Sequence, residues 1–149
     1  MPYKHTQIGY FLIVVLLAVA IEMFFLGHLL PSAGHLLPLA ILFLVLAVLF
    51  SSLTVSVDPH EIKLSFGLGA IRKKIALADI ESCQVCPKRC CSWGIHGWPG
   101  KSWMYNVSGF RSVELLMKNG IKYYIGTDQP QELEKAILEA MKGGLQKSL

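Results

Sequence analysis

Residues 8–26 read IGYFLIVVLLAVAIEMFFL, and residues 36–53 read LLPLAILFLVLAVLFSSL. These apolar runs are nineteen and eighteen residues long, close to the ~20 residues with which an α helix crosses ~30 Å of hydrocarbon. Neither run has the polar stripe of a helix that lies on a membrane surface. The link between them, residues 27–35, holds two Gly and one Pro and suits a tight turn. The sequence therefore predicts a transmembrane helical hairpin within residues 1–52, with spans over 8–26 and 36–53.

The flanking charges predict how this hairpin is oriented. The link between the runs contains no Lys or Arg, whereas Lys4 and the basic second half of the chain lie on the other side. Because basic residues stay on the cytoplasmic face, we expect a multi-pass protein of the cell (inner) membrane with both termini in the cytoplasm. Residues 18–20, AVA, have the pattern of a signal-peptidase site, but the apolar run continues past them, which favours an anchor over a cleaved leader.

One charged residue, Glu22, interrupts the apolar runs, and two histidines, His28 and His35, stand in the link. An intramembrane carboxylate can mark an ion or proton path. Glu22 falls about one turn from the outer end of its run, where its side chain can reach the interface, and the three residues match no local metal-ligand motif. Snorkelling of Glu22 and two exposed histidines is the favoured interpretation.

From residue 53 the pattern changes to short alternating segments separated by turns, which predicts strands. Lys118-Asn119-Gly120 lies between two such segments and is a strong hairpin signal. Asp128 is expected to cap a helix over about 129–142, with Pro130 in its first turn and Gly143-Gly144 at its end. The predicted strands cover residues 53–57, 62–66, 71–77, 80–86, 102–107, 112–117 and 121–125. Residues 53–149 are thus expected to form an α+β domain, a bent antiparallel sheet or open barrel of seven strands closed by a C-terminal helix.

Several motifs of this second half resemble the bacterial pleckstrin-homology-like (PH-like) family. They are Trp93-Gly94-Ile95, residues 103–110 (WMYNVSGF), Val113-Glu114-Leu115, Lys118-Asn119-Gly120 and residues 125–130 (IGTDQP) with Leu133. The resemblance covers about residues 51–142 and implies a seven-stranded antiparallel split barrel, capped by a C-terminal α helix and placed after paired membrane spans. Phosphoinositide binding is not expected, because the first turn, residues 57–61, carries two acids and no Lys or Arg.

All four cysteines fall within nine residues, as C-x2-C-x3-C-C at Cys83, Cys86, Cys90 and Cys91. Four thiolates can hold zinc or an iron–sulfur cluster. The adjacent pair Cys90-Cys91 fits one metal poorly, and alternate strand positions would separate Cys83 from Cys86, although His96 could replace one ligand. A cytoplasmic location argues against structural disulfides, whereas nearby Lys88 and Arg89 would favour thiol reactivity. Ordinary unliganded cysteines, and hence no cofactor, are the favoured prediction, with metal binding and thiol chemistry as alternatives.

The cysteine segment also carries aromatic and basic residues suited to an interaction surface. These are Lys88, Arg89, Trp93, Trp98 and Lys101, of types found where proteins meet anionic membranes. Trp103, in a predicted strand, is expected in the core instead.

The function expected from the sequence is a non-enzymatic module at the cytoplasmic face of the membrane. The chain has no glycine-rich phosphate loop, no H-E-x-x-H motif and no Ser/His/Asp set at a recognisable spacing. Its net charge of +4 is too small to indicate nucleic-acid binding. The expected partners are the lipid bilayer and either a protein or a second copy of this chain. The alternative is a metal-binding or thiol-redox membrane protein that uses Cys83–Cys91.

Overall fold

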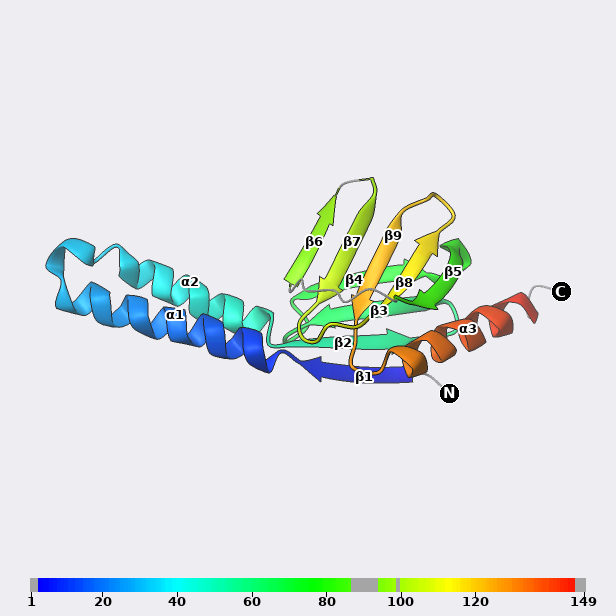
Figure 1. Ribbon diagram of the computed structural model, residues 1–149, viewed down its shortest axis with the longest axis horizontal. Helices are drawn as coiled ribbons and strands as arrows, with labels where there is room; N and C mark the ends of the chain where they lie inside the picture. Colours follow the sequence, from blue (N-terminus) through cyan, green and yellow to red (C-terminus); the bar gives the residue numbers. More distant parts are fainter. Residues whose placement is uncertain (1–2, 87–93, 99, 147–149) are drawn as a thin grey trace.

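A computed structural model of the protein describes residues 3–86, 94–98 and 100–146. It consists of a helical arm and a β domain (Figure 1). The arm contains α1 (Tyr10–Leu29) and α2 (Leu36–Leu49), with a 3₁₀ turn at its tip (Pro31–Ala33). The β domain holds the strands and one helix: β1 (Tyr3–Ile8), β2 (Ser52–Val57), β3 (Glu61–Phe66), β4 (Ile71–Ala76), β5 (Ile80–Val85), β6 (Gly94–Trp98), β7 (Ser102–Asn106), β8 (Ser112–Met117), β9 (Lys122–Gly126) and α3 (Pro130–Gln146).

The first sheet is antiparallel, in the order β1-β2-β3-β4. Its buried face follows from the alternation of β2 and β3, because successive strand residues point to opposite faces. Apolar residues of these two strands meet in register, as Leu53 opposite Phe66, Val55 opposite Leu64 and Val57 opposite Ile62. All six are buried, so the pairing fixes the register as well as the core.

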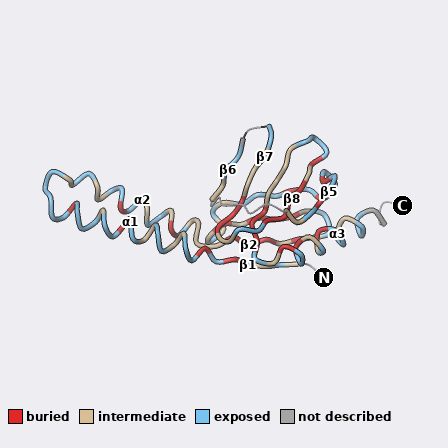
Figure 2. Tube along the Cα trace, in the orientation of Figure 1, coloured by how far each residue is buried: buried red, intermediate tan, exposed pale blue. Residues whose placement is uncertain are grey.

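The second sheet has the order β5-β8-β9-β7-β6, and its strands cross those of the first sheet at a steep angle (Figure 1). The β8–β9 hairpin forms at Asn119-Gly120 as predicted: Gly120 has φ +82°, and the Asn119 side chain accepts a hydrogen bond from the Ile121 amide at 3.0 Å. β9 then pairs with β7 in parallel. The described core lies between the two sheets and α3, which contributes Leu133 and Ile137 (Figure 2).

The predicted fold class is wrong. The described residues form three α helices, and among these only α1 is long and apolar enough to cross a membrane by length and composition. The second apolar run forms a helix of 14 residues, since Phe50 ends α2 and the alternating residues from Ser52 onward join β2 instead. The strands that the structure describes form sheets of four and five with one parallel pairing, in place of a seven-stranded antiparallel barrel.

Two strands that the sequence did not predict, β1 and β6, account for the difference between the predicted and the described number of strands. β1 precedes the arm and pairs with β2 along its whole length, and β6 lies within the segment predicted as a loop. The inward positions of β1 are Tyr3, His5 and Gln7. Because two of these are polar, the strand lacks the alternation of apolar and polar residues by which a strand is recognised in a sequence. β6 contains two glycines, which strands generally disfavour.

The final helix is longer than expected and begins differently. It continues through Gly143-Gly144 to Gln146. Asp128 was the predicted cap, but its carboxylate is hydrogen-bonded to His5 Nε2 at 2.6 Å. The Thr127 hydroxyl accepts a hydrogen bond from the Gln129 amide at 3.1 Å. Pro130 is the first helical residue, the position that its fixed φ favours.

Candidate functional site: the apolar arm and the cleft beneath α3

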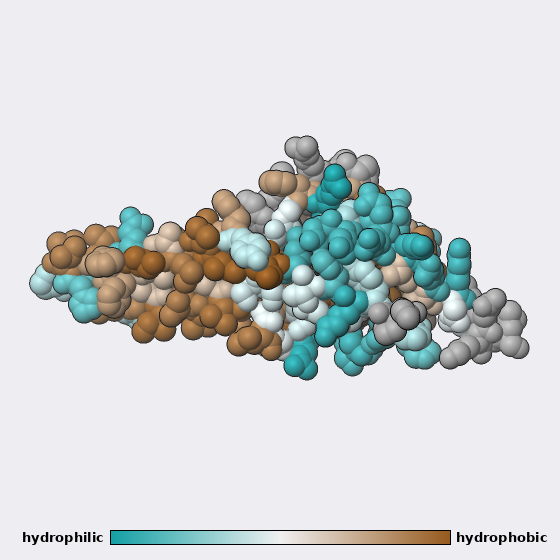
Figure 3. Space-filling model, turned by 90° about the horizontal axis from the view of Figure 1, so that it is seen from below, coloured by the Kyte–Doolittle hydropathy of each residue, from teal (hydrophilic) through white to brown (hydrophobic). Residues whose placement is uncertain are grey.

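The surface of the helical arm is largely apolar. Figure 3 shows it as a hydrophobic projection beside a mostly hydrophilic β domain. The large apolar side chains exposed on α1 and α2 are Tyr10, Phe11, Val14, Val15, Ile21, Phe24, Phe25, Leu26, Leu29, Leu39, Ile41, Leu42, Leu44, Val45 and Val48. An exposed apolar surface of this extent marks a membrane or protein contact, because soluble monomers rarely present one to water.

Small residues hold the two helices of the arm together. The buried positions between them are Ala20 and Gly27 on α1 and Ala40 and Ala47 on α2. A β carbon at Gly27 would lie 3.0 Å from Leu37 Cδ2, so the helices approach closely there. Such small-residue contacts are typical of helix pairs in lipid, where close packing replaces the hydrophobic effect.

The polar residues of the arm do not form a site. Glu22, His28 and His35 are all exposed, and the His28 ring packs edge-on against Phe24 with ring centroids 4.7 Å apart. Among the residues that the structure describes, no group of three or more His, Cys, Asp or Glu side chains is placed to hold a metal ion.

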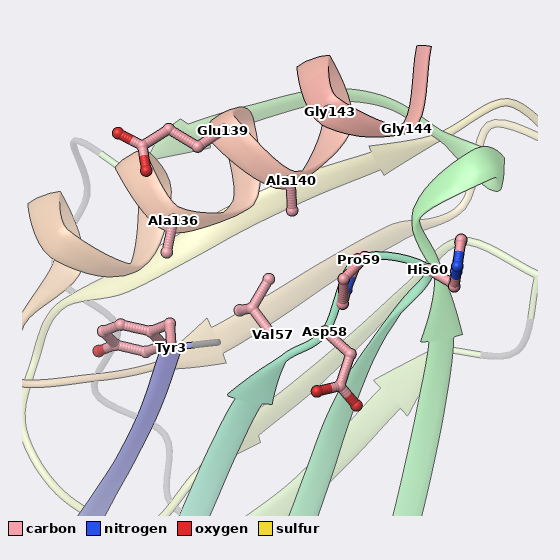
Figure 4. Close-up of a pocket in the computed structure, with 10 residues that line it drawn as sticks. All are labelled: Tyr3, Val57, Asp58, Pro59, His60, Ala136, Glu139, Ala140, Gly143 and Gly144. Carbon is pink, nitrogen blue, oxygen red and sulfur yellow. The ribbon is translucent and has the colours of Figure 1, made fainter. Parts of the chain in front are cut away.

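A cleft of about 550 Å³ opens between α3 and the end of the first sheet. The Tyr3 ring and Val57 form its floor, and Ala136 and Ala140 face them from α3 (Figure 4). Gly143 and Gly144 extend the opening along the helix. These small residues keep α3 from filling the space, and the result is a largely apolar concavity.

The polar rim of the cleft is formed by Asp58, His60 and Glu139. Asp58 is bound to Lys63 Nζ at 2.5 Å, and His60 and Glu139 are exposed. Burial, followed by the nearby carboxylates of Glu132 and Asp128, raises the pKa of Tyr3, so its hydroxyl stays neutral. The apolar floor of the cleft suits an apolar or uncharged group.

The cysteine cluster is described only in part. Cys83 is buried in β5, and Cys86, which follows the strand, is partly exposed; both are free thiols. Cys90 and Cys91 lie outside the described residues, as do Lys88, Arg89 and Trp93. Unliganded cysteines therefore stay the prediction and metal binding the alternative, for which Cys83 would have to leave the core.

We expect Cys83 to resist alkylation in the folded protein. Burial, reinforced by the charge of Glu134, raises its pKa to about 12, so at pH 8 only about one thiol in ten thousand is the reactive thiolate. Peptide mapping after iodoacetamide treatment should find Cys86 modified well before Cys83, and both modified after denaturation. Equal labelling of the two in the folded protein would contradict the burial of Cys83.

The predicted aromatic and basic surface is only partly described. Lys101 is exposed, and Trp98 ends β6. Trp103 packs against the core as predicted, and it also covers Gly97 of the neighbouring strand, where a β carbon would meet its ring at 2.3 Å.

Sequence reasoning missed the contribution of β1 to the cleft and the close contact within the arm. Tyr3 was hidden in a short polar N-terminal segment, and only its alternation with His5 and Gln7 signals a strand. The small residues of the arm were visible in the sequence, but which of them face the partner helix depends on how the helices pair. Comparison of the chain with family models, with curated proteins and with solved structures finds no match.

Proposed function

We propose that this protein is a membrane-anchored, non-enzymatic binding module. The arm inserts into a bilayer, and the β domain remains at the surface, where it meets a protein partner or a second copy of the chain. The exposed apolar surface of the arm carries this proposal, because it would be unfavourable in water and is favourable in lipid.

The dimensions of the arm support insertion from one side. At 1.5 Å per residue, α1 is about 30 Å long and α2 about 21 Å. α1 thus matches a hydrocarbon layer of ~30 Å, while α2 is shorter and packs against it. Both ends of the arm continue into neighbouring strands, since Ile8 pairs with Ser52. The β domain therefore stays on the side from which the arm enters, and the basic excess of the chain assigns that side to the cytoplasm.

The cleft beneath α3 is the proposed binding surface of the β domain. Its apolar floor and uncharged tyrosine suit an apolar side chain of a partner. The absence of glycine-rich phosphate and metalloprotease motifs from the sequence supports a binding role over catalysis. The resemblance to the PH-like family remains an expectation from the sequence.

Membrane fractionation combined with labelling of the arm tip tests the proposal. We expect the full chain to stay in membranes after washing at high pH and to be released by detergent. Ser32→Cys, in the 3₁₀ turn at the tip, should react with a membrane-impermeant maleimide in intact bacterial cells. Asn119→Cys, in the β8–β9 turn, should react only after permeabilisation. The protein without either substitution is the control, because its labelling gives the background from the native cysteines.

The possible results separate anchoring from orientation. A protein found in the soluble fraction without detergent would refute the proposed function. Retention in the membrane with Asn119→Cys labelled in intact cells would reverse the orientation and exclude the cytoplasmic location. Retention with Ser32→Cys unlabelled until permeabilisation would show that the arm enters the layer without α1 crossing it.

A further inference from the structure

Exposed apolar side chains lie at the base of the arm, at the start of α1 and in two loops of the β domain that pack against the arm. Ile8 and Tyr10 flank the junction with α1 and are 43% and 70% exposed. Leu68, in the β3–β4 turn, is 88% exposed, and Phe110, in the β7–β8 loop, is 50% exposed. We call these four residues the collar. They come from three separate segments of the chain, so their presence near one end of the β domain is a product of the fold.

The β3–β4 turn is held against the end of α2. A β carbon at Gly67 would lie 2.6 Å from the carbonyl oxygens of both Val48 and Leu49, and Gly67 has φ +52°. The turn is closed by hydrogen bonds from the Gly69 amide to the Phe66 carbonyl, at 2.9 Å, and from Arg72 Nε to the Gly69 carbonyl, at 2.8 Å. Leu68 is therefore fixed on the side of the β domain from which the arm projects.

The β7–β8 loop is held against the start of α1. A β carbon at Gly9 would lie 2.8 Å from the Val107 carbonyl oxygen, so the two backbones touch. The buried side chain of Gln7 donates a hydrogen bond to the Ser108 carbonyl at 2.6 Å. Phe110 lies two residues beyond Ser108 in the same loop.

The junction between arm and β domain is short. β1 ends at Ile8 and α1 begins at Tyr10, while α2 ends at Leu49 and β2 begins at Ser52. The Gly9 amide donates to the Ser51 carbonyl at 2.8 Å, which joins the two connections. Together with the two docked loops, this junction fixes the β domain relative to the arm. An inserted arm would hold the collar at the level of the lipid head groups.

We propose that the collar is a second membrane-binding surface, which inserts into the interfacial region of the bilayer that holds the arm. The inference rests on the proposed function. Apolar and aromatic side chains favour this region, and tyrosine in particular is enriched there. Arg72 and Arg111 are exposed beside the two collar loops, and their guanidinium groups suit the phosphates of anionic lipids. The contact sets the tilt of the arm and β domain relative to the bilayer, and with it the direction in which the cleft opens.

Photo-crosslinking to lipid tests the collar directly. p-Benzoylphenylalanine is placed at Leu68 or Phe110 in the full chain, in vesicles of phosphatidylcholine and phosphatidylglycerol. Phe25 of α1 serves as the inserted control, and Asn119 of the β8–β9 turn, exposed on the β domain, as the surface control. After irradiation, mass spectrometry measures the fraction of protein that has gained the mass of a phospholipid. We expect adducts at 25, 68 and 110 to exceed that at 119 by about tenfold or more, because the interface confines lipid contact to the inserted residues.

The four positions keep the two proposals distinguishable. Adducts at 25 with only background at 68 or 110 would overturn the collar and leave the anchored arm intact. An adduct at 119 equal to those at 68 and 110 would also overturn it, since lipid contact would then not be specific to the collar. The absence of adducts at all four positions would refute membrane insertion, and with it the proposed function.

Discussion

Arginine in place of both Ile21 and Leu42 is expected to release this protein from membranes. Ile21 lies near the middle of α1, Leu42 near the middle of α2, and both side chains are exposed on the arm. An arginine at the centre of a membrane helix costs about 2.5–3.5 kcal/mol on insertion scales. The double variant should therefore lose about 5–7 kcal/mol of insertion free energy if the two costs add.

Quantitative fractionation measures this effect as the ratio of membrane-bound to soluble or aggregated protein. Leu138→Arg is the matched control, because Leu138 is also an exposed apolar residue, but on α3. We expect the control to fractionate like the unchanged protein. Full membrane retention of the double variant, washed at high pH, would indicate that the arm does not contact hydrocarbon at these positions.

The exchange Gly126→Ala is expected to destabilise the β domain strongly. A β carbon at Gly126 would lie 2.1 Å from Asn106 Oδ1 and 2.4 Å from Asn106 Cγ. Asn106 is 1% exposed and cannot move aside freely, because its side chain donates to the Gly109 carbonyl and accepts the Ser108 amide. Overpacking and the loss of these hydrogen bonds should together cost about 2–4 kcal/mol.

Thermal unfolding in detergent, followed by tryptophan fluorescence, measures this loss. For a domain of this size we expect Tm to fall by roughly 10–20 °C. Gly143→Ala is the control, since nothing lies within 4 Å of its added β carbon and alanine favours the helical backbone of α3. It should stabilise the protein by about 0.5–1 kcal/mol. Equal small effects of the two exchanges would show that β7 and β9 are not packed as described.

Most individual elements follow from local sequence. The alternating residues of β2 and β3, the Asn119-Gly120 hairpin and the spacing of Leu133 and Ile137 in α3 all predict structure that forms. Each signal acts within a few residues, where period and turn chemistry determine conformation. The ends of elements are less predictable: Phe50 ends α2 although the apolar run continues, because the residues that follow find hydrogen-bond partners in β1 and β3.

The sequence predicts the apolar helices of the candidate site but not the residues of its collar and cleft. The apolar runs indicate a pair of apolar helices, whereas the collar and the cleft do not emerge from any local pattern. Leu68 and Phe110 are ordinary loop residues in the sequence. They acquire a common position because Gly67 packs on α2 and Val107 packs on Gly9.

By itself, the sequence determined two apolar helical segments, a strand-rich second half and an amphipathic final helix, because hydrophobic content and periodicity are properties of short segments. Only the tertiary structure decided the pairing of β1 with β2, the parallel contact of β7 with β9 and the small-residue contact within the arm. These features join residues far apart in the chain. Their free energy comes from hydrogen bonds and close packing that exist only once the whole chain has folded.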